Sequence, residues 1–592
     1  MNRRIHGAVP FAVLIAILAA VLVFGGEYSV TLANYIGLSA LVALGLVLLT
    51  GIGGMTSFGQ AAFVGIGAYS SAVTTSAFGL DPWIGLLVAL ALTGLSAYVI
   101  GALTLRLEGH YLPLSTIAWG IALYFLFGNI ELLGGQTGLG GIPPIRMFTF
   151  ALDTPRSIFL LIWLVVMFAL VLATNLLNSG PGRAMRSLKG GAVMAEMFGI
   201  DTATVRVKTF VLAALLAGLS GWLYVHMLRF VNPTPFGLNF GIEYLFMTVV
   251  GGAGLVWGAL VGAATVIISK ELLQDFLPAI LGHGGNYEMI VFGVVLIILL
   301  QKAPEGFLHP LRKFFTSAEY TAQDTGVTPV DLPIRDKPIP DATVLMVSDL
   351  GKKFAGLVAL EGLSFSLRAG EIVGVIGPNG AGKSTMFNVV SGVISPTTGS
   401  VQFWGRSIER LPSRKIAAEG LARTFQHVLL LPTMSVVENV MIGADHRAST
   451  GFLPALLHLE RRREKAVRLE ASRQLDRVGL AQSALAEAGS LALGQQRIVE
   501  IARALSADPT ILLLDEPAAG LRLQEKVALA KTLRQLRREG VSILIVEHDM
   551  DFVMNLVDRL IVLDFGHLIA EGKPEFIQSD ARVLEAYLGG VE

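Results

Sequence analysis

A short segment of the sequence carries the glycines, lysine and hydroxyls that suit the binding of a phosphate chain. It reads GPNGAGKST (377–385) and follows the apolar run EIVGVIG (371–377). Glycines let a backbone fold around an anion, and successive N–H groups at a helix start meet phosphate charge. We expect Lys383 to reach the terminal phosphates and Ser384 to hold Mg²⁺. The predicted phosphate-binding residues are Gly377, Asn379, Gly380, Gly382, Lys383, Ser384 and Thr385.

Acidic residues end a second apolar run, ILLLDEP (511–517). Asp515 is suited to bind Mg²⁺, and Glu516 beside it is placed to polarise an attacking water. A third buried run, ILIVEHD (543–549), ends near His548, which is placed to sense a γ-phosphate. An acidic strand end or a structural histidine would be ordinary by itself, and the phosphate-binding segment favours the catalytic interpretation.

The elements that must position these residues are strands interleaved with helices. Apolar alternation resumes at Val344, buried runs recur, and helical patterns follow from Lys383 onward. This order predicts an α/β domain over 344–592. The stretch before it, 302–343, is rich in proline and aperiodic, which predicts an extended linker.

The first half of the chain has a different composition. Residues 1–300 carry 23 of the 90 charged side chains, and the absence of cysteine excludes disulfides, thiolate catalysis and cysteine-bound zinc. Apolar runs long enough to cross a membrane predict a polytopic all-α membrane domain over 1–301. The predicted windows are 8–24, 30–50, 55–78, 83–105, 112–133, 157–177, 208–230, 242–269 and 288–301.

The number of crossings follows from the basic residues. Basic residues favour the cytoplasm, and they lie at both ends of this half, so the count must be even and about ten spans are expected. The window 242–269 is the expected place of the extra crossing, because Gly251, Gly252 and Gly254 interrupt it. We interpret the run 8–24 as the first span and not as a cleaved signal.

Polar residues within the spans are few. Asn34, Gln60, Asn129 and His226 face either a substrate pathway or neighbouring helices through ordinary hydrogen bonds. Carboxylates form no ladder that would relay protons, so the energy source is expected elsewhere. The longest polar connection, 178–208, predicts a turn and a short helix, which is either a basic loop at lipid head groups or a part that a motor pushes.

The residues of the second half resemble an ATP-binding-cassette (ABC) nucleotide-binding domain, with every part in order. LALGQQR (491–497) stands at the signature, and AAGL (518–521) follows the acidic motif. The resemblance implies that Phe354 stacks on adenine and that Gln426, in RTFQH, touches Mg²⁺ and the permease. It implies Glu516 and His548 as catalytic, Ser384, Gln426 and Asp515 as metal-binding, and Gly494 and Gln495 as a cap on ATP held by another cassette.

The first half resembles the permeases of branched-chain (hydrophobic) amino-acid ABC importers over most of residues 30–310. The segments that carry the resemblance are GMTSFGQAAFVGIGAY (54–69), LRLEGHYLPLSTIAWG (105–120), GQTGLGGI (135–142), the stretch 182–224, GIEYLFMTVVGGAGLVWGALVGA (241–263) and PEGFL (304–308). The chain therefore resembles a natural fusion of permease and ATPase, and 182–200 is implied as the helix that couples the two.

The resemblance implies ATP-driven import of branched-chain or related small metabolites across a bacterial inner membrane, with the ATPase in the cytoplasm. ATP and Mg²⁺ are the implied cofactors. The implied partners are a second permease and a second ATPase (or another copy of this chain), a periplasmic binding protein and membrane lipid, with no nucleic acid. The alternatives are a homodimeric half-exporter and a cassette that regulates a channel.

The second half departs from the cassette pattern in two places, the signature, where Leu493 also stands in place of the usual glycine, and the residue after AAGL. Ala492 replaces the usual serine, and Arg522 replaces the aspartate expected after AAGL. Loss of one hydroxyl contact to a phosphate would cost about 1.5–3 kcal/mol, enough to slow one of two composite ATP sites. The alternative is that the family tolerates alanine here and the two sites are equal.

Overall fold

The computed structural model describes residues 3–105, 111–148, 150–281, 328–448 and 451–588, with a few isolated positions between 291 and 302. It divides into two compact units, which we treat separately. Unit 1 is residues 1–178 and 203–321, and unit 2 is residues 179–202 and 322–592. Much of the predicted last span and the start of the predicted linker lie outside the described residues.

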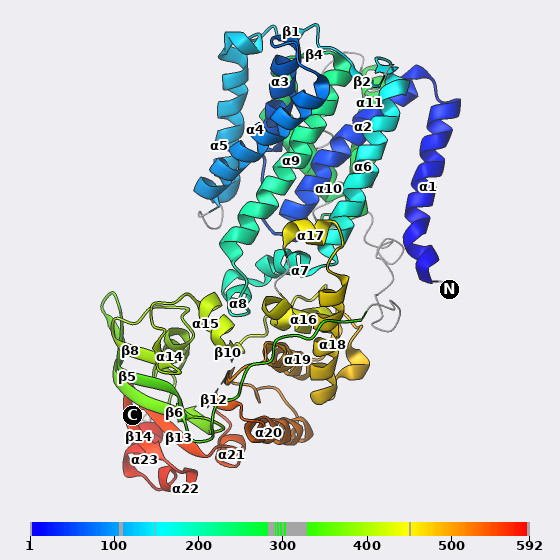
Figure 1. Ribbon diagram of the computed structural model, residues 1–592. Helices are drawn as coiled ribbons and strands as arrows, with labels where there is room; N and C mark the ends of the chain where they lie inside the picture. Colours follow the sequence, from blue (N-terminus) through cyan, green and yellow to red (C-terminus); the bar gives the residue numbers. More distant parts are fainter. Residues whose placement is uncertain are drawn as a thin grey trace. The chain divides into compact units, whose positions relative to one another are not determined.

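Unit 1 is a bundle of helices (Figure 1). Six of its described helices are long and apolar enough to cross a membrane, which confirms a membrane domain of several helices, while the number ten stays a prediction. The six are α2 (Glu27–Leu46, continued by η1), α4 (Pro82–Thr104), α5 (Tyr111–Asn129), α6 (Pro155–Leu177), α9 (Thr202–Leu228) and α11 (Val256–Leu281). The other main helices are α1 (Arg3–Phe24), α3 (Gln60–Ser76) and α10 (Leu238–Gly251).

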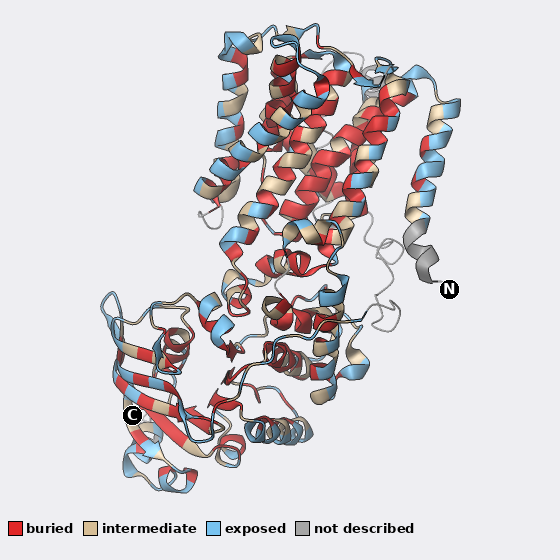
Figure 2. Ribbon diagram, viewed as in Figure 1, coloured by how far each residue is buried: buried red, intermediate tan, exposed pale blue. Residues whose placement is uncertain are grey.

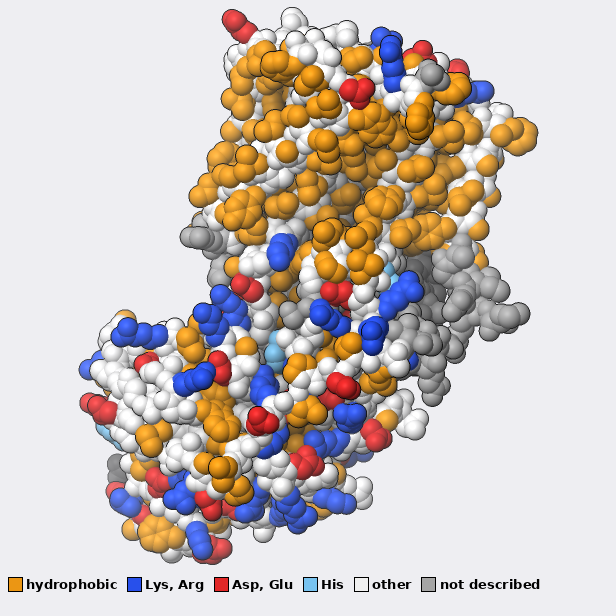
Figure 3. All heavy atoms as spheres, in the orientation of Figure 1, with side chains coloured by type: hydrophobic (Ala, Val, Ile, Leu, Met, Phe, Trp, Pro, Cys, Tyr) orange, Lys and Arg blue, Asp and Glu red, His pale blue; other side chains and the backbone are white. Residues whose placement is uncertain are grey.

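Short elements join these helices. They are the 3₁₀ turns η2 (Glu131–Leu133) and η4 (Thr234–Phe236) and the strand pairs β1 (Leu139–Gly140) with β4 (Phe230–Val231) and β2 (Ile145–Met147) with β3 (Phe150–Leu152). The outer surface of the bundle is covered by hydrophobic side chains, as Figure 3 shows, and those of α4 include Leu87, Leu95 and Leu103. Such a surface suits hydrocarbon as solvent.

Two regions of unit 1 depart from regular α-helix, and they approach each other closely. α2 continues as the π-helical turn η1 (Val47–Ile52), and the chain is then irregular until α3. The predicted interruption at 251–254 is confirmed, since α10 ends at Gly251 and Gly252 has a φ of 103°. A Cβ on Gly51 would lie 1.6 Å from the carbonyl oxygen of Ala253, so only glycine permits this approach.

Unit 2 contains the predicted α/β fold. Its central sheet has the order β10-β11-β12-β7-β13-β14, in which only β14 runs antiparallel to its neighbour. Figure 2 shows the buried strands at the centre of the unit. Buried parallel strands read as continuous apolar runs, as these do. The strands are β7 (Ile372–Ile376), β10 (Leu421–Arg423), β11 (Ile511–Asp515), β12 (Ser542–Val546), β13 (Arg559–Asp564) and β14 (His567–Gly572).

A second sheet and two groups of helices complete the unit. The antiparallel sheet has the order β6-β5-β8-β9, from β5 (Thr343–Phe354), β6 (Leu357–Arg368), β8 (Thr398–Phe403) and β9 (Arg406–Ser407). The helices α16 (Val436–Ala448), α18 (Arg461–Arg477) and α19 (Leu493–Ser506) share a separate apolar core. The remaining helices are α14 (Lys383–Val390), α15 (Ser413–Glu419), α17 (Phe452–Leu456), α20 (Leu523–Arg538), α21 (Met550–Met554), α22 (Pro574–Ile577) and α23 (Ala581–Leu588).

Two segments that precede the sheets in sequence pack within unit 2. One is the connection 179–202, which forms α7 (Gly180–Ser187), η3 (Leu188–Gly190) and α8 (Ala192–Glu196) and lies within the range predicted for the permease. The other is the described part of the linker, where the Arg335 guanidinium donates to the carbonyl oxygens of Ala418, Ala507 and Asp508. This part of the linker therefore lies against the α/β fold of unit 2.

Candidate nucleotide site

The loop from β7 to α14 is shaped by its glycines. Gly377, Gly380 and Gly382 have φ values of 150°, 84° and 97°, a region that other residues rarely adopt. A Cβ on Gly377 would lie 2.1 Å from the carbonyl oxygen of Leu563. The loop therefore folds back tightly and opens onto the N-terminus of α14, as an anion site requires. At its rim Asn379 and Ser384 are exposed, and Thr385 is half-buried.

Lys383 begins α14, and its side chain is buried. Its Nζ donates to the carbonyl oxygens of Gly377 (2.6 Å) and Pro378 (2.8 Å). Burial lowers the pKa of the ammonium group, and the charges of Glu516 and Asp515 oppose that shift. The ammonium group thus lies across its own loop, close to two carboxylates, where it can neutralise a phosphate.

Asp515 ends β11 and is held by a residue that the sequence did not single out. The Nη2 of Arg423 lies 3.3 Å from Asp515 Oδ2, and Arg423 also donates to Asn388 and Ser391. Its guanidinium lies 5.5 Å from the ring centres of Phe387 and Phe425. Burial raises the pKa of Asp515 and Arg423 opposes that shift, so the ion pair keeps a buried carboxylate available.

Glu516 is where the remaining predicted groups meet. Its Oε1 accepts a hydrogen bond from Nε2 of Gln426 (3.1 Å) and lies 3.0 Å from Nε2 of His548. The backbone of Glu516 is left-handed, with a φ of 49°, which turns its side chain out of the strand direction. A carboxylate between an amide donor and an imidazole is suited to orient and deprotonate a water.

Two further residues arrange the backbone around Glu516. Arg497 of α19 donates to the carbonyl oxygens of Glu516 (2.7 Å) and Gln426 (3.1 Å). Buried Glu547 accepts from the backbone N–H of Ala518 (2.5 Å) and of His548 (3.0 Å). Arg497 and Glu547 bind main-chain atoms of segments that are distant in sequence, so motif spacing did not predict their roles. The one local clue was that Glu547 directly precedes His548.

The other predicted residues lie at separate places. Phe354 ends β5 with its ring partly exposed, and Lys352 Nζ lies 5.1 Å from the ring centre. Gly494 and Gln495 are in the first turn of α19, where Gly494 faces Leu521. Their role as a cap for a nucleotide held by another cassette stays a prediction.

Three side chains predicted to bind metal have oxygen atoms of the kind that Mg²⁺ prefers as ligands. The Ser384 hydroxyl, the Gln426 amide and the Asp515 carboxylate are hard oxygen ligands, and Mg²⁺ usually adds waters and phosphate oxygens to a few such groups. Among the described residues no cluster of three or more His, Asp or Glu side chains forms a protein-only metal cage. The cation would therefore be shared with a phosphate chain.

The connection 179–202 is anchored in unit 2 by a buried arginine. The Arg183 guanidinium pairs with Asp445 (Nε to Oδ2, 3.0 Å) and with Glu464 (Nη2 to Oε2, 3.0 Å). Its pKa is raised, because the two carboxylates outweigh the burial that by itself would lower it. Arg186 lies 3.3 Å from Glu438 on the same face of α16. The connection therefore docks through charge as well as through packing.

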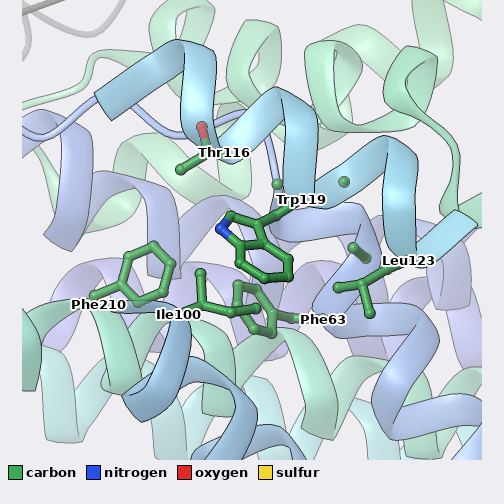
Figure 4. Close-up of a pocket in the computed structure, with 9 residues that line it drawn as sticks. Phe63, Ile100, Thr116, Trp119, Leu123 and Phe210 are labelled. Atoms are coloured by element: carbon green, nitrogen blue, oxygen red, sulfur yellow. The ribbon is translucent and has the colours of Figure 1, made fainter. Parts of the chain in front are cut away.

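Unit 1 shows a small cavity and one unpaired amide. Figure 4 shows Trp119 among Phe63, Ile100 and Phe210, beside a cavity of about 10 Å³ that has room for one water and none for an amino acid. Three of the four polar residues predicted for a pathway make ordinary hydrogen bonds: Asn34 to Pro155, Asn129 to Phe125, and His226 to Ser71 and Pro143. The amide of buried Gln60 has no partner among the described residues.

The comparisons with known proteins agree with this geometry. Residues 28–300 match the family model "Branched-chain amino acid transport system / permease component", residues 360–519 match "ABC transporter", and residues 567–592 match "Branched-chain amino acid ATP-binding cassette transporter". The fold and the site thus define a membrane permease and an ABC ATPase on one chain. The C-terminal half hydrolyses ATP in a reaction coupled to transport.

The relatives specify the family. The chain is 42% identical over 249 residues to the high-affinity branched-chain amino acid transport ATP-binding protein BraF of Pseudomonas aeruginosa, covering 42% of this chain and 98% of that protein. It is 41% identical over 249 residues to LivG of Escherichia coli K12, with the same coverage. The chain belongs to the branched-chain amino-acid ABC transporter family. A nucleotide-free cassette structure is 33% identical, covers 42% of this chain and 99% of that one, and has a TM-score of 0.38.

Proposed function

We propose that this chain imports branched-chain or related hydrophobic amino acids across a bacterial inner membrane by hydrolysing ATP in the cytoplasm. The observation that carries the proposal is the presence, on one chain, of a permease-family region and a site where Gln426 and His548 meet the Glu516 carboxylate. A cassette that only regulated a channel would not need this hydrolytic arrangement.

Each site residue has a role in the proposed reaction. The loop 377–385 and Lys383 bind the phosphates, and Phe354 stacks on the adenine. Ser384, Gln426 and Asp515 would hold Mg²⁺, which would offset charge on the terminal phosphates. Glu516 accepts a proton from the attacking water, and His548 orients Glu516 and the γ-phosphate. Gly494 and Gln495 cap ATP in a partner cassette.

The connection 179–202 is the proposed mechanical link. It lies between two membrane helices in sequence, yet Arg183 buries its charge against Asp445 and Glu464 of the ATPase fold. A shift of α16 and α18 on ATP binding would therefore pull on both helix ends. This link requires no further subunit.

The proposal includes four kinds of partner: a second permease, a second ATPase, a periplasmic binding protein and lipid. A single cassette supplies one phosphate loop and one cap, whereas closed sites need two of each. Purification of the chain from its native cells in a gentle detergent, with identification of the proteins that co-purify, tests this composition. Recovery of this chain alone would favour a homodimer, including a half-exporter.

The transport activity is tested by reconstituting that purified assembly with its binding protein in proteoliposomes. We expect ATP-dependent uptake of labelled leucine, isoleucine or valine, and its loss in Glu516→Gln, which keeps ATP binding. The loss of hydrolysis at that site should reach about 100-fold, the usual contribution of a general base. ATP-driven efflux, or uptake unaffected by the substitution, would contradict the proposal.

A further inference from the structure

A short segment of unit 2 carries exposed leucines that do not contribute to the buried core of the unit. It comprises α17 and the residues that follow it to Arg463, and we call it the leucine–arginine segment (452–463). Ala455 faces inward and is buried. Leu453, Leu457 and Leu459 face outward and are 67%, 50% and 72% exposed. Leucines grouped so closely on a surface indicate an apolar partner.

Basic residues follow the leucines directly. Arg461, Arg462 and Arg463 are all exposed, at the start of α18. Of the neighbouring acids, Glu464 pairs with buried Arg183, whereas Glu460 lies 3.8 Å from Arg463 and offsets part of the charge of that arginine. The segment thus joins an apolar tip to a cluster of positive charge, the combination typical of elements that lie in a membrane interface.

The segment contacts an element that is close in sequence to an apolar helix. α17 packs against α7, as Figure 1 also shows. α7 begins at Gly180, and the apolar helix α6 ends at Leu177. Three residues span at most about 10 Å. α17 therefore contacts an element that directly follows an apolar, membrane-length helix in the chain, which makes lipid the apolar partner that we consider.

We propose that the leucine–arginine segment is a lipid-binding surface of the ATPase unit. Leu453, Leu457 and Leu459 enter the boundary between head groups and acyl chains, and the three arginines bind anionic head groups. This surface holds α17 and α18 at the bilayer, and α18 carries Glu464, the partner of Arg183. Lipid contact would thereby support the same helix that anchors the connection 179–202.

The absence of cysteine from the chain makes the test direct. Single-cysteine variants Leu453→Cys and Leu457→Cys of the full chain are labelled with an environment-sensitive fluorophore and placed in nanodiscs with or without nitroxide-labelled lipid. Phe576→Cys is the matched control, since Phe576 is 55% exposed on α22, which Figure 1 shows at the other end of the same unit. ATPase activity of each labelled variant confirms that it is folded.

We expect nitroxide lipid to quench the fluorophore at 453 and 457 by about twofold or more, and the one at 576 hardly at all. Replacing Arg461, Arg462 and Arg463 by glutamine should reduce that quenching in nanodiscs containing phosphatidylglycerol, and less in phosphatidylcholine alone. Quenching at 457 equal to that at 576 would overturn the proposal. So would a blue-shifted, unquenched fluorophore, which would show that a protein covers the leucines. Neither result depends on the transported substrate.

Discussion

At the scale of single residues, the site depends on arginines that do not touch the nucleotide. Arg423 lies between two phenylalanine rings and pairs with Asp515, which is nearly fully buried. A buried carboxylate without a partner is costly, so Asp515 needs this arginine whenever no metal is bound. The same ion pair links β10 to β11, two neighbouring strands of the central sheet.

Replacing Arg423 by methionine should therefore destabilise the ATPase unit. Removing one member of a buried pair costs about 3–5 kcal/mol. Calorimetric thermal unfolding of the full chain measures the change. Arg473→Met is the control, since Arg473 is exposed and pairs with Glu470 on the surface, where an ion pair contributes about 0–1 kcal/mol. Equal effects of the two substitutions would contradict the role given to Arg423.

We expect the stability of the ATPase unit to depend on pH because of His446. Burial and the charges of Arg335 and Arg447 lower its pKa to about 4, against the opposing charge of Asp508. Between pH 6.5 and about pH 4, His446 is therefore protonated in the unfolded chain but neutral in the folded chain. The free energy of unfolding should fall as pH falls through that window, by at most about 1.4 kcal/mol per pH unit.

The variant His446→Gln isolates this effect. Glutamine keeps an acceptor for the Arg335 guanidinium, which lies 3.2 Å from His446 Nε2, and it does not titrate. Unfolding measured across the same pH window should show a shallower decline for the variant than for the native chain. Parallel declines would assign the acid sensitivity to other groups.

The sequence predicted the residues that form motifs and missed those that support them. Glycine, lysine and acidic residues at fixed spacing beside apolar runs pointed to Lys383 and Glu516. Arg423, Arg497 and Glu547 act through hydrogen bonds to atoms far away in the chain, which no local spacing reveals. The assigned roles of the motif residues remain predictions, although the structure brings Gln426 and His548 to Glu516.

At the scale of elements, the connection 179–202 is the most informative segment. Its length and its Gly180-Pro181-Gly182 opening predicted a turn and a short helix, and α7, η3 and α8 are the outcome. The family resemblance supplied the expectation that it docks on the cassette. The sequence did not predict the ion pairs of Arg183 with Asp445 and Glu464, because the partners are more than two hundred residues apart.

Replacing Arg183 by alanine should uncouple ATP hydrolysis from transport. The substitution leaves Asp445 and Glu464 buried without their cation, at a cost of about 3–5 kcal/mol to the docking of α7. We expect fewer substrate molecules taken up per ATP hydrolysed by the reconstituted assembly. Arg186→Ala is the control, because its partner Glu438 is 3.3 Å away at a more exposed position and the loss should be small. A ratio unchanged in Arg183→Ala would remove this link from the mechanism.

Helix interruptions show where element prediction succeeds and fails. Three glycines within 251–254 announced the break between α10 and α11, since glycine weakens a helix and permits a left-handed turn. The π-helical η1 was missed because VLLTGI is apolar and continues the window 30–50 without a signal. The π-helical turn is explained by a tertiary contact, because Gly51 lies close to the backbone of Ala253.

At the scale of the whole molecule, the residues that cap ATP bear on whether the two ATP sites of the proposed assembly are equal. Ala492 precedes α19 and makes no side-chain cap, and Arg522 precedes α20. In the proposed assembly, the cap that this chain would lend a partner lacks a hydroxyl, which would weaken phosphate binding by about 1.5–3 kcal/mol. The phosphate loop and Glu516 of this chain show no corresponding loss.

Glutamate substitutions in the two cassettes distinguish the alternatives. If the cap is weak, Glu516→Gln should remove most of the ATPase activity of the assembly, and the equivalent substitution in the partner cassette should remove little. Ala492→Ser should then bring the two losses closer together. Equal losses in an otherwise native assembly would show that alanine is tolerated and that the sites are alike.

The described part of the linker has a consequence for how the transporter is made and kept. Arg335 fastens the chain to the ATPase fold at three carbonyl oxygens, and the connection 179–202 returns to the same fold. A tethered module sees its binding site at an effective concentration in the millimolar range. The docking of α7 can therefore be weak enough to yield and re-form in every cycle without the motor ever diffusing away. The permease region and the ATPase of this chain are synthesised together, so these two parts are always made in equal numbers.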